Sequence, residues 1–266
     1  WALIESENQK VINKIKSNGI YLKDLTDIHI FRGIVTGCNE AFVIDELTKN
    51  RLIKEDSNSS KIIKPFLAGK DIKRYQSPRT NKYLIITQRG IEIENYPAVF
   101  KHLKKYETQL SKKAGGGKWY ELQASPSDTD KFEKTKIMYP DISKDMNFII
   151  DEESHYSVNT VYNISSDSKA LLAYLNSKVF HFYYLTISNS IRGGYLRFFT
   201  DYMNNCPIPK DLSILEELSI KIIDAKKQNP SADTSALESQ IDQLVYQLYD
   251  LTEEEIKIVE ENTSIH

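Results

Sequence analysis

The chain has 266 residues, 27% of them charged, a mean hydropathy of −0.46 and a net charge of −2, which together indicate a soluble globular protein. Its 10 Gly and 8 Pro exclude a fibrous or disordered chain, and no apolar run approaches the roughly 18 residues of a membrane helix, so we expect no membrane partner. Cys38 and Cys206 stand far apart, which excludes a disulfide scaffold and a Cys-rich zinc site and favours the cytoplasm.

The first half of the chain mixes helical and strand-like patterns. Apolar residues at helical spacing predict a helix over 2–18, with Gly19 at its C-cap. Two strands are expected next, over 28–37 and 40–44, joined by a tight turn at 36–39. A basic segment over 61–75, broken by Pro65 and Gly69, precedes a strand over 82–87. A helix over 97–113 and a flexible glycine loop over 114–122 follow.

The second half begins with strands and ends with helices. Strand-like runs cover 136–142, 146–151 and 156–164, and a helix over 168–188 and a basic glycine loop over 189–199 follow. Pro207 and Pro209 are expected to end this mixed region, because prolines interrupt regular strand pairing. Three helices then complete the chain, and Thr252 and Glu255 form a capping box at the start of the last one.

These patterns predict an α+β fold: a β-rich body with peripheral helices, followed by a C-terminal helical segment. We divide the chain into an N-terminal linker helix (1–20), the body (21–210) and the helical segment (211–266). The helical segment carries 4 Lys and no Arg against 13 Asp and Glu, whereas the rest carries 31 basic and 24 acidic residues. A basic body suggests an anionic partner such as nucleic acid, although acidic surface helices are also common in proteins without one.

The sequence lacks the common cofactor and metal motifs. Gly117 and Lys118 resemble the end of a phosphate-binding P-loop, but Lys112 and Trp119 stand where that motif requires Gly and Ser or Thr. There is no G-x-G-x-x-G fingerprint, and the five histidines are scattered. A Mg²⁺-dependent nuclease could use a pattern such as Asp141, Asp167 and Lys169, but this pattern is expected by chance in a chain of this length, which favours structural roles.

Basic residues recur beside aromatic residues and glycines at three places in the body. The groups are Lys64, Lys70, Lys73 and Arg74 with Tyr75; Lys112, Lys113 and Lys118 with Trp119 and Tyr120; and Arg192 and Arg197 with Tyr195. Lys and Arg neutralise phosphates, Arg and Asn on loops hydrogen-bond to base edges, and glycine allows close approach of the backbone. Together the groups favour a DNA-binding surface over the alternative of a solvated basic face above buried aromatics.

Short blocks along nearly the whole chain follow the order found in one known family. They are 33–44, 63–75, 118–122, 136–143, 159–162, 171–177, 193–197, 207–209 and 241–252. These blocks resemble the TaqI-like C-terminal specificity domain of bacterial adenine-N6 DNA methyltransferases and fused type II restriction-modification enzymes. The family's usual glycine before the final Leu-Thr is replaced by Asp250 here.

The resemblance implies a target-recognition domain that docks on double-stranded DNA and selects the site. In the family, a separate N-terminal catalytic domain of the same polypeptide binds S-adenosylmethionine and methylates a flipped-out adenine. That domain's Asn/Asp-Pro-Pro-aromatic motif is absent here, so we expect no catalytic residue, cofactor or metal in this chain. S-adenosylmethionine, and Mg²⁺ if the parent protein also cleaves DNA, would bind elsewhere in a longer protein, which agrees with a start at Trp1 rather than Met.

The resemblance and the basic groups together give the candidate DNA contacts. Thr36, Asn39 and Glu40 are expected on a loop near the DNA. The candidates for contacts to backbone phosphates are Lys70, Lys73, Arg74 and Lys118, although Trp119 and Tyr120 beside Lys118 are more typical of core anchors. Arg192, Tyr195 and Arg197 are the candidates for contact in a groove of the duplex, because two arginines flank glycines in a loop.

Two other functions stay open at this point. In one, the chain is a protein-interaction module of a multi-subunit restriction or phage-exclusion system, and its acidic helical tail binds a partner subunit. In the other, it is a nuclease that uses Asp141, Asp167 and Lys169.

Overall fold

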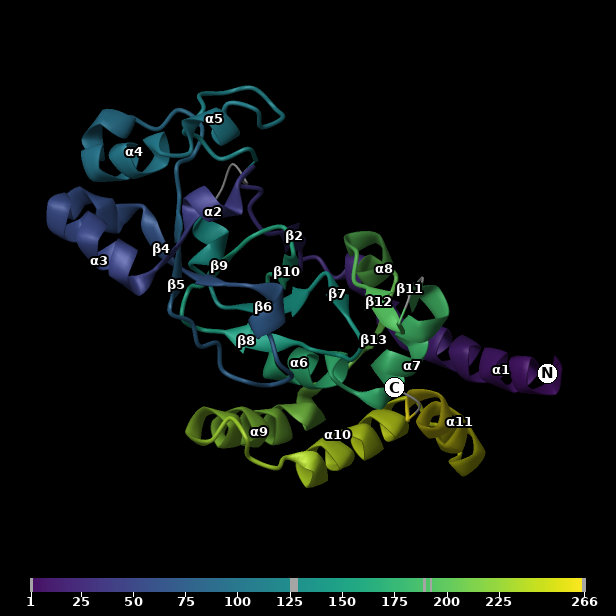
Figure 1. The fold of residues 1–266 in the computed structure, drawn as a ribbon. Coiled ribbons are helices and arrows are strands. Elements are labelled where there is room, and N and C mark those ends of the chain that lie inside the picture. Colours follow the sequence, from purple (N-terminus) through teal and green to yellow (C-terminus); the bar gives the residue numbers. More distant parts are fainter. Residues whose placement is uncertain (1, 125–128, 189, 192, 265–266) are drawn as a thin grey trace.

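The computed structural model describes residues 2–124, 129–188, 190–191 and 193–264. The molecule consists of an upper lobe and a larger lower part, and each surrounds a core of its own (Figure 1). From here on, the term body means this lower part alone. The core of the upper lobe comes from residues between Ile34 and Phe132, joined by Tyr156 and Val158. The core of the body comes mainly from residues after Ile137 together with the N-terminal helix. The chain therefore crosses between the two parts more than once, which places distant segments side by side.

The upper lobe is a four-stranded sheet covered by short helices. Its strands, in spatial order, are β3 (Val43–Asp45), β5 (Lys82–Ile85), β4 (Ile63–Leu67) and β9 (Tyr156–Ser157), and only the β4–β9 pair is parallel. Its helices are α2 (Asn39–Phe42), α3 (Glu46–Glu55), α4 (Pro97–Lys104) and α5 (Glu107–Leu110). Because β9 follows a strand of the body, this parallel pair joins the lobe to the body.

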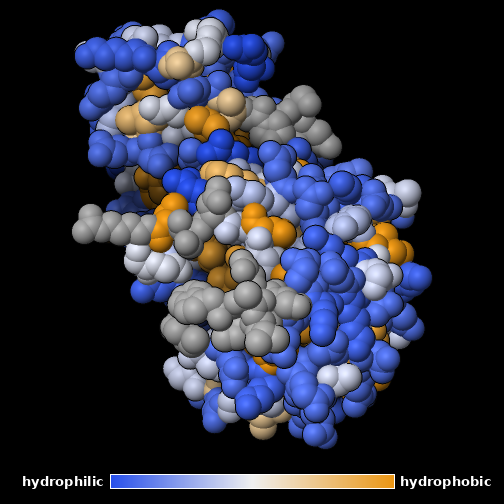
Figure 2. Space-filling view, turned by 90° about the vertical axis from the view of Figure 1, so that its right-hand side faces the viewer, coloured by the Kyte–Doolittle hydropathy of each residue, from blue (hydrophilic) through white to orange (hydrophobic). Residues whose placement is uncertain are grey.

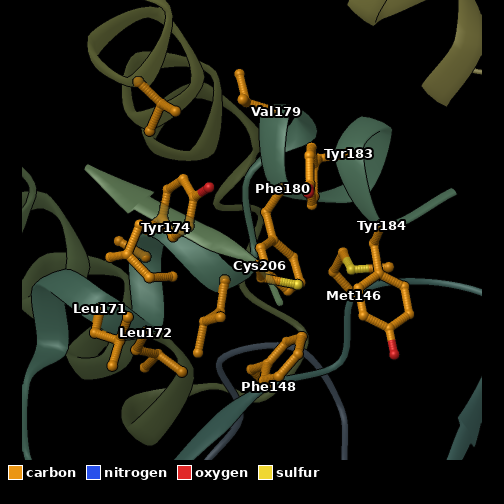
Figure 3. Close-up of a cluster of buried hydrophobic side chains, with 14 of the residues drawn as sticks. Met146, Phe148, Leu171, Leu172, Tyr174, Val179, Phe180, Tyr183, Tyr184 and Cys206 are labelled. Atoms are coloured by element: carbon orange, nitrogen blue, oxygen red, sulfur yellow. The ribbon is translucent and has the colours of Figure 1, made fainter. Parts of the chain in front are cut away.

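The body contains an antiparallel sheet with helices packed against it. The sheet order is β2 (Ile30–Arg32), β10 (Val161–Ile164), β6 (Lys136–Pro140) and β8 (Ile149–Asp151). A smaller sheet joins β11 (Ser190–Ile191), β12 (Tyr195–Arg197) and β7 (Ile142–Ser143). The helices of this region are α6 (Lys169–Leu175), α7 (Lys178–Ile187) and α8 (Thr200–Asn204). Figure 3 shows how Phe148, Tyr174, Phe180 and Cys206 meet between these elements in the core.

The two ends of the chain pack against each other. Helix α1 (Ala2–Asn18) leads into β1 (Gly19–Tyr21), which pairs with β13 (Pro207–Pro209). Helices α9 (Glu216–Gln228), α10 (Ser235–Leu248) and α11 (Glu253–Thr263) follow, and a 2.7 Å ion pair from Lys14 to Glu255 joins α1 to α11. The remaining short 3₁₀ turns are Leu22–Asp24, Ser57–Lys61, Gly69–Asp71, Ile93–Asn95, Asp130–Phe132 and Ser213–Leu215.

The predicted α+β fold class is confirmed, and so are the N-terminal helix, the three C-terminal helices and the capping box at Thr252. Two long predicted helices are each interrupted. The helix expected over 97–113 ends at Lys104 and resumes as α5, and the helix expected over 168–188 is split at Ser177, whose hydroxyl accepts a hydrogen bond from the Phe180 amide and so starts a second helix.

Three predictions about strands are wrong. The segments over 28–37 and 40–44 do not form adjacent strands, since residues 39–42 are helical and β2 and β3 lie in different sheets. In the segment predicted as a loop over 189–199, Ser190–Ile191 pairs antiparallel with Tyr195–Leu196, and Gly193 and Gly194 have φ of 90° and 78°. Pro207 and Pro209 lie within a strand, because they occupy alternate positions of a two-stranded pair and Ile208 between them retains its N–H.

Candidate nucleic-acid interface

A groove of about 630 Å³ lies where three segments of the body meet. It is lined by the turn Gly69–Lys73, by residues 140–145 and by Tyr195 of β12. The turn fits tightly against β10, because a Cβ at Gly69 would come 2.9 Å from the Thr160 carbonyl oxygen. Asn147 fixes two walls relative to each other: its Oδ1 accepts from the Arg74 amide at 3.0 Å and its Nδ2 donates to Ser143 Oγ at 2.8 Å.

The groove collects exposed cations around one exposed aromatic ring. Lys70, Lys73 and Lys144 are all exposed along its walls. The Lys144 ammonium lies 5.1 Å from the centre of the Tyr195 ring, which is 40% exposed. Such a set offers phosphate-neutralising charge beside a flat surface on which a base or sugar can pack.

A carboxylate flanked by two arginines lines the groove. Asp141 follows β6, and burial raises the pKa of its carboxyl group, an effect that the charges of Arg32 and Arg197 oppose. Arg197 lies on the same face of β12 as Tyr195, because side chains alternate along a strand and Leu196 between them is buried. Guanidinium and carboxylate groups of this kind can hydrogen-bond to base edges.

A second group of predicted residues lies in the upper lobe. Thr36 is buried, and its hydroxyl donates to Asn39 Oδ1 at 2.7 Å, while Asn39 and Glu40 are exposed at the start of α2. This turn lies against the loop after α5, since a Cβ at Gly37 would come 3.0 Å from Lys113 Cβ. The structure thus brings the segment 36–40 beside the loop that carries Lys118.

Arg74 lies apart from both groups. Its guanidinium forms a 2.6 Å ion pair with Glu238 of α10. The predicted contact between Arg74 and a phosphate remains untested, and the ion pair disfavours it because Glu238 already occupies the guanidinium. Arg192 lies outside the described residues. Trp119 and Tyr120 pack against Phe100, with ring centres 5.5 Å and 5.9 Å away, in agreement with core anchors.

The residues of the nuclease hypothesis do not come together. Pro140 pairs with Val161 and Ile137 with Ile164, so Asp141 and Asp167 follow opposite ends of the β6–β10 pair, whose end residues lie three residue steps or roughly 10 Å apart. Lys169 forms a 3.1 Å ion pair with Glu152 instead. In the described part of the chain, no three His, Cys, Asp or Glu side chains are grouped to hold a metal ion.

Lys144 and Asn147 were not predicted from the sequence. Lys144 has no aromatic residue or glycine next to it, and only the pairing of β7 with β12 places it at Tyr195. Asn147 precedes Phe148 but carries no charge, so the basic pattern does not include it. Among the described residues, no helix is both long and apolar enough to cross a membrane.

Known proteins share both the sequence pattern and the fold. A family model, the TaqI-like C-terminal specificity domain, matches residues 64–208. The chain is 23% identical over 267 residues to the type II methyltransferase M.PaeR7I of Pseudomonas aeruginosa, a match that covers 95% of this chain and 43% of that protein. It is 27% identical over 179 residues to the type II methyltransferase M.XhoI of Xanthomonas vasicola, covering 64% and 31%. The chain thus spans less than half the length of these curated relatives.

Two solved structures have a similar fold. The type IIL restriction-modification enzyme MmeI, determined in complex with DNA, aligns with a TM-score of 0.66 at 16% identity over 86% of this chain and 34% of that one. The type IIG restriction endonuclease BpuSI aligns with a TM-score of 0.50 at 15% identity, covering 92% and 33%. At these identities the likeness establishes the fold alone, whereas the family match covers more than half of the sequence. This chain therefore belongs to the family of TaqI-like C-terminal specificity domains.

Proposed function

We propose that this chain is the target-recognition domain of a site-specific adenine-N6 DNA methyltransferase or fused restriction-modification enzyme, and that it binds double-stranded DNA sequence-specifically. The family membership and the DNA in the MmeI structure support this function. In this proposal the catalytic domain, with its S-adenosylmethionine and any Mg²⁺ needed for cleavage, lies N-terminally in the same polypeptide, and the complete protein acts in the cytoplasm.

The observation that carries the proposal is the groove with Lys70, Lys73 and Lys144 around Tyr195. Three exposed ammonium groups from two segments, the turn Gly69–Lys73 and the segment that carries Lys144, converge there. Asp141 and Asp145 also line the groove, but in the described structure none of the three ammonium groups forms a salt bridge with a carboxylate. Unpaired cations in one groove suit a polyanion, because each phosphate contact releases condensed counterions. Asp141 in the groove and Arg197 beside it would then face base edges.

The test is the triple variant Lys70→Ala/Lys73→Ala/Lys144→Ala, measured on random-sequence duplex DNA. We expect its affinity at low salt to fall by roughly tenfold or more, and the slope of log K against log salt to fall by about two to three, because each lost phosphate contact contributes about 0.9. The matched control is Lys54→Ala/Lys221→Ala/Lys257→Ala, which removes the same charge from α3, α9 and α11. Equal losses in the two variants would overturn the proposed location of the interface.

A further inference from the structure

The glycine-rich loop after α5 is held in place by a partly buried polar network. Lys113 Nζ donates to the carbonyl oxygens of Lys118 at 2.8 Å and Trp119 at 2.9 Å, and also to that of Glu121. These three bonds use all three N–H groups of the ammonium. The loop predicted to be flexible is therefore closed onto one central cation, and its two ends are fixed relative to each other.

A carboxylate holds the same loop from its other side. Glu121 is only 3% exposed and accepts from the amides of Gly90 and Lys118, each at 2.9 Å. Burial acts to raise the pKa of Glu121, but these two amides and the charge of Lys113 together hold it below its usual value, so the group stays ionised. Arg89 completes the network by donating to the Gly116 carbonyl at 2.9 Å.

The loop backbone is shaped for glycine alone at two positions. Gly115 and Gly117 have φ of 85° and 107°, and a Cβ at Gly117 would come 2.5 Å from Glu121 Oε2. Gly116 between them has a φ outside the left-handed region and space around it, since the nearest atom to an added Cβ is Arg89 Nη2 at 3.7 Å. The network thus holds an exposed stretch of backbone without side chains, over 115–117.

The held loop borders a small hollow and carries mostly positive charge. The hollow measures about 260 Å³ and is lined by the three glycines, Ser111, Lys113 and Trp119. Arg89, Lys112 and Lys118 are exposed around it. The acidic groups that act on this region are Glu121, whose carboxylate already accepts two amides, and Glu94, which acts on Lys118.

We propose that residues 115–118 form a second contact to a DNA backbone phosphate, in the upper lobe, and that Lys113 and Glu121 are the positioning residues that hold the loop for it. This inference rests on the proposed function. A glycine backbone allows a phosphate to approach closely, and Lys118 and Arg89 supply the charge. With the groove in the body, DNA would then contact both parts of the molecule. Figure 2 shows the upper lobe above the larger lower body, with hydrophilic residues over much of the visible face of both.

The first test adds a negative charge to the loop without straining it. We expect Gly116→Glu to raise the Kd for random-sequence duplex DNA about tenfold and to reduce the salt slope by about one, since one phosphate contact is lost. The matched control is Asn50→Glu, which adds the same charge at an exposed site on α3, on the opposite side of the upper lobe from this loop (Figure 1).

The second test addresses the positioning residues. Glu121→Gln keeps the size of the side chain but replaces one acceptor oxygen with an NH₂ group, so one of the two amides loses its partner. We expect faster amide exchange at 115–118 and a salt slope reduced by about one. A purely structural role would lower thermal stability and leave the salt slope of the folded protein unchanged.

The outcomes separate this inference from the function on which it rests. If the wild-type chain binds DNA but Gly116→Glu behaves like Asn50→Glu, the second contact is overturned and the groove interface stands. If Glu121→Gln alone leaves the slope unchanged, the positioning role is overturned. If the wild-type chain binds no DNA at any salt concentration, the proposed function itself fails.

Discussion

Asp242 is a carboxylate that the fold buries where α10 packs against α7. It is 5% exposed, and its Oδ1 accepts from the Lys178 amide at 2.8 Å. Burial raises its pKa to about 6, an effect that the Lys178 amide and the charges of Arg74 and Lys178 oppose and that Glu238 reinforces. At neutral pH the protein therefore carries a charge in a site that favours the neutral acid.

This burial predicts a pH-dependent effect of Asp242→Asn. The folded pKa of about 6 lies above the usual value of 3.8, so the group stabilises the fold fully below pH 4, and this contribution is lost as pH rises through 6. Asparagine does not titrate and retains an oxygen for the Lys178 amide. We expect the variant to be more stable than wild type at pH 7, by up to roughly 3 kcal/mol, with the difference shrinking towards pH 4. Urea unfolding at pH 4, 5.5 and 7 measures it, and a difference independent of pH would contradict the assignment.

The backbone at the end of α10 favours a glycine at the position of Asp250. Asp250 has a φ of 52°, a left-handed conformation that favours glycine, and the next amide, of Leu251, donates back to the Tyr246 carbonyl at 3.0 Å. The family's usual residue at this position is glycine. The hydrogen bond from Leu251 to Tyr246 thus ends the helix, although the Cβ of Asp250 disfavours the left-handed backbone conformation that this bond requires.

We therefore expect Asp250→Gly to raise the free energy of unfolding by roughly 0.5 to 1 kcal/mol, because relief of the left-handed strain exceeds the entropy cost of glycine. Asp250→Val should lower it, since a β-branched residue disfavours this conformation more strongly. Thermal unfolding of the three proteins checks the order Gly, Asp, Val. Any other order would show that this backbone angle does not limit the stability of the tail.

Elements set by neighbouring residues were predictable, and pairings between distant residues were not. The tail helices follow from apolar spacing and from caps such as Thr252, which act within one turn. Of the strand predicted over 28–37, only Ile30–Arg32 forms β2, and its partner β10 lies some 130 residues away, where no local pattern indicates it. Pro209 was misjudged for the same reason: its place in a strand depends on a partner, Gly19, from the other end of the chain.

The same limit applies to the candidate site. Lys70, Lys73 and Tyr195 were found by composition and do converge on one groove. Arg74 belongs to the same basic run, but the turn directs it to Glu238, and Lys144 joins the groove only through strand pairing. Which residues of a basic run face a common surface depends on tertiary structure, and composition does not carry that information.

At the scale of the whole molecule, charge and shape agree with one DNA-binding side. Helices α9, α10 and α11 lie below the body, on the side away from the upper lobe (Figure 1), so the excess of acidic residues in the tail is held away from the glycine loop. The hydroxyl groups of Tyr174 and Tyr249 both donate to the Pro207 carbonyl, at 2.6 Å and 3.1 Å, which fixes the tail to the body. The alternative in which the acidic helical tail binds a partner subunit stays a prediction.

The central claim is most directly tested by the affinity of the wild-type chain for random-sequence duplex DNA at about 50 and 200 mM salt. We predict a Kd in the range of about 1 to 100 μM at the higher concentration and a marked tightening at the lower one, because several phosphate contacts release counterions. Selection from a random library would then yield a preferred site. Absence of binding at both concentrations, or an affinity that does not change with salt, would contradict the account.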